Sequence, residues 1–306
     1  YDYVDDNDVI IVGLDQTSYQ YIGSFYPYKR DIIWSKVVNN LTDAGVSSII
    51  FDIMFDTQTL KDSIFSESIK RAEKKGIDII LATKKTFDIE LANQNFSLTK
   101  PSYDIINGTN VKLGLVGVAG DKDGFIRRYI TTDTTITDDY QKKYYSLAIE
   151  AVSNFINKEP EINSRGIKIG DIYIPHYNSQ NTFLLNYFGP NSYSYNNQTF
   201  RTISLYEVLD DCDMQDYDGD GISDNSNCSS ILNGLPAWNS EHQDSIYAVG
   251  AMIDYIDLFP DIFKNKIVII GSALEEHHDI FNTPFDSFNK AGPMYGVELH
   301  AHAIQQ

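Results

Sequence analysis

Val9-Ile10-Ile11-Val12-Gly13-Leu14 and Ile267-Val268-Ile269-Ile270 are the two stretches that decide the fold. Each is a continuous apolar run rich in β-branched residues, and each stops at an acidic or small residue, Asp15 in the first case and Gly271 in the second. Continuous runs of this kind are typical of parallel strands that are covered on both faces. Because one run lies near each end of the chain, we expect the first and last parts of the chain to share one sheet.

Strands and helices alternate after the first run. Asp31 begins a stretch with helical spacing of apolar residues that ends near Gly45, and a buried strand follows over residues 47–55. A second helix is expected over residues 63–75 and a third strand over residues 77–83. This alternation with short connections predicts a parallel sheet.

The middle of the chain is less regular. Two strands are expected over residues 113–119 and 125–131, around the turn signal Asp123-Gly124. The further elements expected are a helix over residues 145–156 and strands over residues 167–174 and 183–187. We therefore predict one α/β domain over residues 1–306, with a mostly parallel central sheet flanked by helices, an antiparallel hairpin extension and loop insertions.

The bulk composition excludes several classes of protein. With 24 Lys and Arg against 43 Asp and Glu, the formal net charge is −19, and no basic stripe exists that would bind a nucleic acid. A hydrophobic content of 42% excludes a disordered chain. No apolar run approaches the length of a membrane span, and the acidic first residues do not resemble a signal peptide. The chain starts almost on a strand and stops inside a helical pattern, which favours a domain excised from a longer protein.

The sharpest local motif lies in an insertion over about residues 210–233. Its acidic residues and glycines follow the spacing of calcium-binding loops. The expected ligands are Asp216, Asp218, Asp220, the backbone carbonyl of Ile222, Asp224 and Asn227. Asn227 replaces the usual bidentate Glu, and the loop is similar to those of thrombospondin type 3 and dockerin modules. We expect a structural Ca²⁺ here, and the alternative is a solvated acidic turn that binds no ion.

The two cysteines of the chain, Cys212 and Cys228, flank this motif. In a reducing compartment they would be free thiols or half of a metal site, whereas in an exported protein they would form a local disulfide. We favour the disulfide, which together with the ion would hold the inserted loop in place.

Three further positions follow predicted parallel strands at their carboxyl ends, namely Asp15, Asp52 and Gly271-Ser272. Ligands bind at this edge of open α/β sheets. If the strands are neighbours, the two carboxylates meet in one crevice, where they would hold a metal ion, a cationic ligand or Arg30. Alternatively, the two aspartates cap the following loops or pair with Arg30 without any ligand.

Four of the six histidines occur late in the chain, at His277, His278, His300 and His302. Glu298 and His302 are four residues apart and would share one helix face. A zinc site is one hypothesis, but the sequence has no H-E-x-x-H spacing, and a hydrogen-bonding or pH-sensitive role is the favoured interpretation. The G-x-S-x-G, P-loop and G-x-G-x-x-G motifs are missing, so we expect no enzymatic activity.

Eight stretches, taken in order along nearly the whole chain, resemble the CHASE2 family of extracytoplasmic sensor domains. They are residues 10–18, Tyr26-Pro27-Tyr28-Lys29-Arg30, Ala44-Gly45 with residues 49–55, Asp121 to Arg128 (similar to DxDGvvRR), Tyr145-Ser146-Leu147-Ala148, residues 263–271, Asp279 with Thr283-Pro284, and residues 296–304 (similar to GVEiHAnAI). The aromatic loop departs from the family pattern, since Tyr replaces both Trp residues and Lys29 replaces a Pro. The calcium-type loop is not a general feature of the family.

The resemblance implies a domain outside the cytoplasm, in the periplasm or at the cell exterior, between transmembrane helices of a bacterial receptor. Such receptors carry adenylate or diguanylate cyclases, histidine kinases or Ser/Thr kinases inside the cell. Membrane helices would then precede Tyr1 and follow Gln306, and the family context allows a homodimer.

Our hypothesis from the sequence is a ligand-sensing domain. An unidentified small molecule or ion would bind in the crevice and favour one arrangement of the helix over residues 298–306. The residues expected around it are Asp15, Tyr26, Tyr28, Arg30, Asp52, Ser272 and His300. Two alternatives remain: a secreted metal-dependent hydrolase that uses Asp15 and Asp52, and a calcium-dependent adhesion or interaction module.

Overall fold

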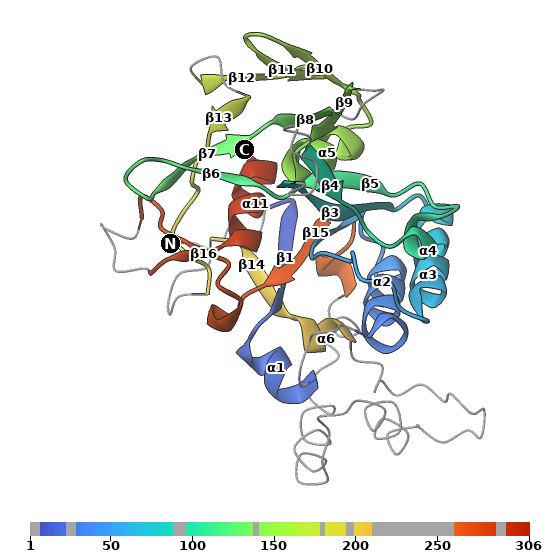
Figure 1. Cartoon of the computed structure of the whole chain (residues 1–306). Helices are drawn as coiled ribbons and strands as arrows, with labels where there is room; N and C mark the ends of the chain where they lie inside the picture. The colour runs from blue at the N-terminus through green and yellow to red at the C-terminus, as the bar shows by residue number, and fades with distance from the viewer. Residues whose placement is uncertain are drawn as a thin grey trace, which may run out of the picture.

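β1 (Val9–Leu14) and β15 (Ile267–Ser272) lie side by side as parallel strands, from Val9 opposite Ile267 to Leu14 opposite Ser272. The two apolar runs therefore share one sheet, as the sequence predicts (Figure 1). This computed structural model describes residues 7–22, 29–87, 96–136, 141–177, 181–193, 199–209, 260–285 and 292–306.

The central sheet has seven strands in the order β14-β1-β15-β2-β3-β4, and β5 also pairs with β3. Within the described residues, every pair of this sheet is parallel except β3 with β4. Its remaining strands are β2 (Ser48–Asp52), β3 (Asp78–Phe87), β4 (Phe96–Thr99), β5 (Lys112–Leu115) and β14 (Arg201–Ser204). The predicted α/β class with a mostly parallel central sheet is confirmed, and the last strand of the sheet in sequence, β15, lies between β1 and β2.

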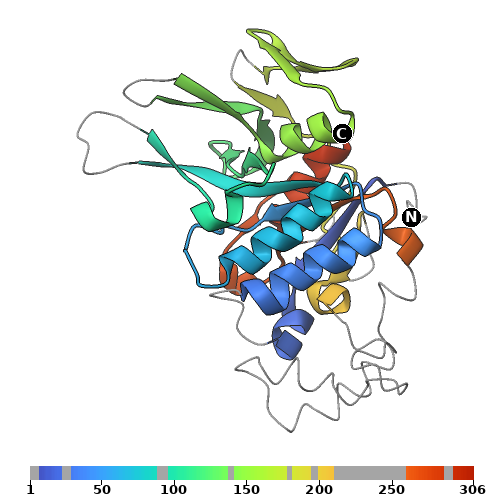
Figure 2. The same cartoon turned by 90° about the vertical axis from the view of Figure 1, so that its right-hand side faces the viewer.

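Alternate side chains of each strand enter two separate cores. In β1, Ile10, Val12 and Leu14 belong to the first core, while Val9 and Ile11 belong to the second. The first core lies under η1 (Arg30–Trp34), α1 (Gln16–Ile22), α2 (Ser35–Asp43), α3 (Asp62–Lys74), α4 (Tyr103–Ile106) and α6 (Leu205–Leu209). The second lies under α5 (Leu147–Phe155) and α11 (Gly296–Gln305). Figure 2 shows α2 and α3 side by side along one face of the sheet.

Aromatic rings fill the first core. Trp34 lies edge-on to Phe51 and to Phe55, with ring centroids 5.7 Å apart in each pair. Phe65 of α3 lies edge-on to Phe51 at 5.8 Å. All four side chains are fully buried. Because each such pair contributes about 0.5–1.5 kcal/mol beyond burial, the cluster fixes η1 and α3 against β2.

Small antiparallel sheets extend the domain beyond the central sheet. The largest two are β6 (Val118–Gly120) with β7 (Ile126–Ile130) and β13 (Thr182–Leu184), and β10 (Pro160–Asn163) with β11 (Gly166–Ile169) and β12 (Ile172–Pro175). Two-stranded sheets are formed by β8 (Thr132–Ile136) with β9 (Gln141–Tyr145), and by β16 (Ile280–Phe281) with β17 (Met294–Tyr295). Short 3-10 helices are η4 (Pro260–Ile262) and η5 (Glu275–His277).

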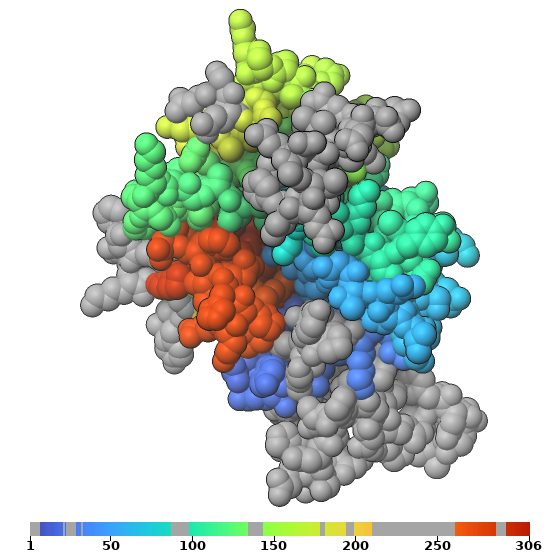
Figure 3. All heavy atoms as spheres, viewed as in Figure 1, coloured from blue at the N-terminus to red at the C-terminus, as the bar shows by residue number. Residues whose placement is uncertain are grey.

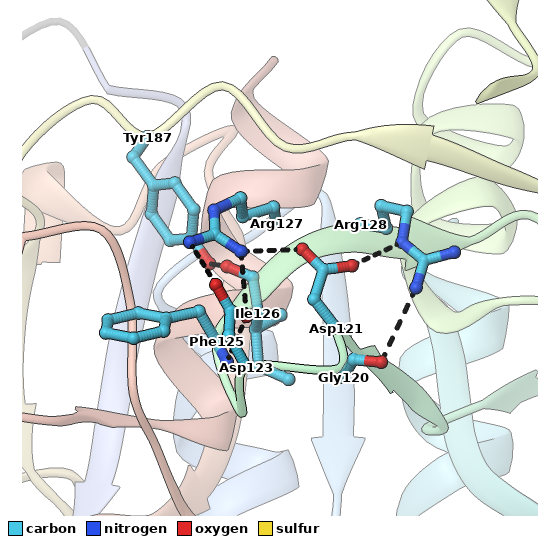
Figure 4. A network of polar contacts seen from close by, with 8 residues as sticks. All are labelled: Gly120, Asp121, Asp123, Phe125, Ile126, Arg127, Arg128 and Tyr187. Atoms are coloured by element: carbon cyan, nitrogen blue, oxygen red, sulfur yellow. Dashed lines mark hydrogen bonds and ion pairs between the residues drawn. The ribbon is translucent and has the colours of Figure 1, made fainter.

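Charged side chains hold the β6–β7 turn in shape (Figure 4). Arg127 forms ion pairs with Asp121 at 2.8 Å and Asp123 at 2.9 Å, and Arg128 reaches Asp121 at 2.7 Å. Gly124 adopts a φ of 83°, a left-handed conformation that suits glycine, so the Asp-Gly turn signal is confirmed. The carboxylates of Asp121 and Asp123 are therefore both engaged in ion pairs within this hairpin.

Two expectations from the sequence are wrong in detail. Residues 167–174, expected as one strand, form the hairpin β11–β12, because Gly170 has a left-handed φ of 58° that reverses the chain. Residues 113–119, expected as the first strand of a hairpin, are divided between β5 and β6. β5 joins the central sheet beside β3, and only β6 pairs with β7.

α11 crosses the sheet from its carboxyl edge to its amino edge. At the beginning of α11, the backbone amide of Gly296 donates to the carbonyl of Asp279 at 2.9 Å. At its end, Gln305 Oε1 accepts a hydrogen bond from the amide of Asp8 at 3.0 Å, directly before β1. Among the helices in the described part of the chain, none has both the length and the apolar character that a bilayer crossing requires.

Candidate functional site

The carboxyl ends of β1, β15 and β2 meet at one edge of the sheet. Gly13 lies opposite Gly271, and Gly271 lies opposite Asp52. The strands before Asp15, Ser272 and Asp52 are therefore neighbours, which is the condition that the sequence hypothesis required. The first turn of α11 lies on these strands so closely that a Cβ atom on Gly271 would be 2.7 Å from Val297 Cβ.

Asp52 and His300 form the centre of this edge. Nε2 of His300 on α11 lies 3.5 Å from Oδ1 of Asp52 on β2, and Nδ1 of His300 contacts the hydroxyl of Tyr129 on β7. The side chains are 3% exposed for His300 and 8% for Asp52, so their charges interact in a largely water-free environment. The other carboxylate oxygen of Asp52, Oδ2, is buried and has no hydrogen-bond partner in the described structure.

The ionisation of these groups is coupled. Burial and the charge of Asp52 raise the pKa of Tyr129 well above its ordinary value, so that the Tyr129 hydroxyl keeps its proton. The Tyr129 hydroxyl therefore donates to Nδ1 when His300 is neutral and accepts from it when His300 is protonated. Burial works to lower the pKa of His300, but the negative charges of Asp52 and Asp279 outweigh burial and the pKa is raised.

Asp279 is a member of this site that the sequence hypothesis did not include. Its carboxylate lies on Gly296, where a Cβ atom would be 2.2 Å from Asp279 Oδ2, so only glycine fits at the start of α11. Burial and the charge of Asp52 raise the pKa of Asp279 to about 6, although His300 opposes the shift. The sequence offers one signal for Asp279, which is that it belongs to a stretch resembling the family pattern. That signal does not indicate which strand of the sheet the side chain of Asp279 approaches.

Asp15 and Ser272 make local hydrogen bonds at this edge. Asp15 Oδ1 accepts from the amide of Ser18 at 2.8 Å, and Oδ2 accepts from the hydroxyl of Ser204. This is the capping arrangement that the sequence analysis gave as the alternative for Asp15. The hydroxyl of Ser272 contacts Nδ1 of His277 at 2.7 Å.

Arg30 belongs to the opposite core. Its Nε donates to Oδ1 of Asp62 at 3.0 Å, one guanidinium nitrogen donates to the carbonyl of Thr57, and the guanidinium lies 4.7 Å from the ring centroid of Phe55. The ion pair that the structure shows for Arg30 is therefore with Asp62 on α3. A ligand-binding role of Arg30 stays a prediction.

The other side of α11 carries two more buried ionisable groups. Glu298 Oε1 accepts from the amide and the hydroxyl of Ser192, at 2.8 and 2.5 Å, and burial raises the pKa of Glu298 to about 7 against the effect of these bonds. His302 accepts from the amide of Phe188 at 3.2 Å, and burial lowers its pKa to about 3. Three of the ten residues of α11 are thus buried ionisable groups with specific partners. In the part of the chain that the structure describes, no three His, Cys, Asp or Glu side chains gather into a metal site.

The surface over this edge is formed by segments from distant parts of the chain. The β6–β7 hairpin contacts the segment after β15, since the amide of Ile126 donates to the carbonyl of Asn282 at 2.9 Å. Figure 3 shows a green region of the chain next to an orange-red one on this face. The other predicted site residues lie outside the described residues, namely Tyr26, Tyr28, Cys212, Asp216, Asp218, Asp220, Ile222, Asp224, Asn227 and Cys228.

Comparison with known protein families matches residues 2–306 to the family model described as CHASE2 domain. Comparison with curated proteins and with solved structures found no match.

Proposed function

This chain belongs to the CHASE2 family, a family of extracytoplasmic sensor domains, and we propose that it detects a stimulus for a bacterial transmembrane receptor and transmits it through α11. The receptor would carry a cyclase or a kinase in the cytoplasm. The domain itself would have no catalytic activity and would lie in the periplasm or at the cell exterior.

The path of α11 is the observation that supports this proposal. The helix begins at the site formed by Asp52, Asp279 and His300, and it ends beside Asp8 at the start of β1. At about 1.5 Å per residue, its ten residues span about 15 Å. All of its residues except Gln305 are buried in contact with the rest of the domain. If the first turn of α11 is displaced, the helix would therefore shift as one body, and its far end would move as well.

We propose Asp52 and His300 as the centre that responds to the stimulus, since they join α11 to the central sheet. A small molecule or ion at this edge would compete for the buried Asp52 carboxylate. Asp15, Tyr26, Tyr28, Arg30 and Ser272 remain the other proposed contacts. The stimulus acts if it binds one arrangement of α11 more tightly than the other.

A screen of small solutes and ions against the 306-residue chain tests the binding step. Ligands that raise the unfolding temperature would then be examined by hydrogen exchange of the α11 amides. We expect an active ligand to change exchange in α11 and to lose its effect in Asp52→Asn. The matched control is Asp78→Asn, which alters an aspartate at the opposite edge of the sheet. Ligands that leave α11 unchanged, or that bind Asp52→Asn equally well, would contradict the proposed site.

Cysteine labelling of the intact receptor in cells tests the location. Leu60 is 99% exposed in the loop before α3, so Leu60→Cys presents a thiol that a membrane-impermeant maleimide can reach. We expect labelling of intact cells, with the unsubstituted receptor as the control for Cys212 and Cys228. Labelling only after lysis would place the domain in the cytoplasm and refute the proposal.

A further inference from the structure

One imidazole and two carboxylates lie near the first turns of α11. Asp279 lies on Gly296, the first residue of the helix, while Asp52 and His300 face each other across the gap between β2 and α11. The charge of Asp52 acts on Asp279, and both carboxylates act on His300. No Lys or Arg among the described residues forms an ion pair with either aspartate. His300 is the group whose positive charge opposes the charge of the two carboxylates.

Asp279 is the carboxyl group of the cluster whose pKa is raised, to about 6, by burial and by the charge of Asp52. Oδ2 of Asp52 is buried without a hydrogen-bond partner in the described structure, and the half-buried carboxylate of Asp279 lies against Gly296 at the start of α11. Binding of a proton requires no ligand cavity. A proton on Asp279 would remove the repulsion between its carboxylate and that of Asp52 where α11 begins. When Asp279 loses its proton, its half-buried carboxylate carries a negative charge that Asp52 repels and that His300 offsets only in part, next to the first turn of α11.

We propose that Asp52, Asp279 and His300 form a proton-operated latch that holds the first turn of α11 against the sheet. With a proton on the cluster the latch is closed, and its loss on alkalinisation weakens the hold on α11. The inference rests on the proposed role of α11 as the transmitting helix, and it names the proton as a stimulus at that site.

Tyr129 is an ionisable neighbour of the cluster, whereas Glu298 and His302 of α11 face other partners. Tyr129 on β7 contacts His300 and keeps its hydroxyl proton. Glu298 and His302 point to the other side of the helix, toward Ser192 and Phe188. Their titration also changes the stability of the helix, so the latch must be isolated by comparison with a variant that changes only Asp279.

Hydrogen exchange of the amides at residues 299–302, expressed as protection factors, tests the latch in the 306-residue chain. The folded-state pKa of Asp279 of about 6 lies above the ordinary value for aspartate. Protection should therefore be greatest near pH 4 and fall by at most about tenfold for each pH unit up to 6. Asp279→Asn cannot lose a proton, so the difference in protection between the two chains should follow this course. Asp78→Asn, which removes a carboxyl group at the amino edge of the sheet, should retain the full response.

Two outcomes would overturn the latch. One is the same pH dependence of protection in Asp279→Asn as in the unsubstituted chain. The other is a ¹³C titration of the Asp279 carboxyl in the unsubstituted chain with an ordinary aspartate midpoint, a measurement that does not depend on the folding of any variant. If hydrogen exchange in α11 does not depend on pH but changes with a solute found in the screen, the latch is wrong while the proposed sensor function stands.

Discussion

Nε2 of His300 lies 3.5 Å from Oδ1 of Asp52, and this contact joins the last helix of the domain to the strand β2. Both side chains are almost fully buried, and a buried ion pair is poor evidence for stability, because removal from water costs as much as the attraction returns. The contact links α11 to β2 next to the position where the helix packs on Gly271 of β15. A change in the protonation or the ligation of either partner therefore acts directly on the helix.

Gly271→Ala should destabilise the domain by separating α11 from the sheet. The new Cβ atom would be 2.7 Å from Val297 Cβ and 3.2 Å from Asp52 Cβ, so either the helix or the strand must move. We expect the free energy of unfolding to fall by about 1–3 kcal/mol, measured by urea denaturation. The control is Gly120→Ala, where the nearest heavy atom would be at an ordinary 3.7 Å. Equal stabilities of the two variants would show that α11 is not closely packed on β15.

Arg30→Met should cost about 3–5 kcal/mol of unfolding free energy, since it leaves the carboxylate of Asp62 buried without its cation. The side chains of this pair are 5% and 0% exposed. Arg71→Met is the matched control, because the Arg71–Asp43 pair is 41% and 55% exposed and such pairs contribute about 0–1 kcal/mol. A loss of less than 1 kcal/mol in Arg30→Met would contradict a structural role for this pair.

The sequence predicted the central sheet well because its strands are continuous apolar runs. β1, β2 and β15 are buried on both faces, and this requirement is visible in the residues themselves. β14 carries no such signal, since Arg201-Thr202-Ile203-Ser204 is short and mostly polar at the edge of the sheet. Its position beside β1 is determined by tertiary pairing, which local sequence does not report.

The candidate site was only partly predictable for a similar reason. The rule that ligands bind at the carboxyl edge of parallel strands identified Asp52, and the late cluster of histidines identified His300. Asp279 and Tyr129 reach the same place from a loop and from an antiparallel strand, which no strand-end rule covers. Arg30 was assigned to the same edge, but its side chain enters the other core with Asp62 because the π-helix η1 begins at Arg30.

His302 and Glu298 should give the domain opposite pH dependences. The folded-state pKa of His302, about 3, lies below the ordinary 6.5, so stability is lost as pH falls from 6.5 toward 3. The folded-state pKa of Glu298, about 7, lies above the ordinary 4.5, so stability is lost as pH rises from 4.5 to 7. Relative to the unsubstituted chain, His302→Gln should gain about 2 kcal/mol between pH 7 and pH 5, whereas Glu298→Gln should lose about 2–3 kcal/mol.

Urea denaturation at the two pH values measures both differences. His278→Asn is the control, since His278 is exposed and its φ of 54° suits asparagine. Parallel pH profiles for His302→Gln and the unsubstituted chain would show that His302 is charged or accessible in the folded protein.

Removal of calcium should destabilise the domain if the loop over residues 210–233 binds the ion as its spacing predicts. For a site of millimolar affinity in about 10 mM Ca²⁺, binding contributes about 1.4 kcal/mol, which corresponds to a fall in unfolding temperature of a few degrees when a chelator is added. Asp218→Ala should abolish the effect of the chelator. Asp123→Asn is the matched control, because Asp123 lies in a second D-x-D-G sequence whose carboxylates already pair with Arg127 and Arg128. An unfolding temperature that does not change with chelator in the unsubstituted chain would leave the acidic loop as a solvated turn, and the repulsion among its carboxylates would then be relieved by water and salt alone.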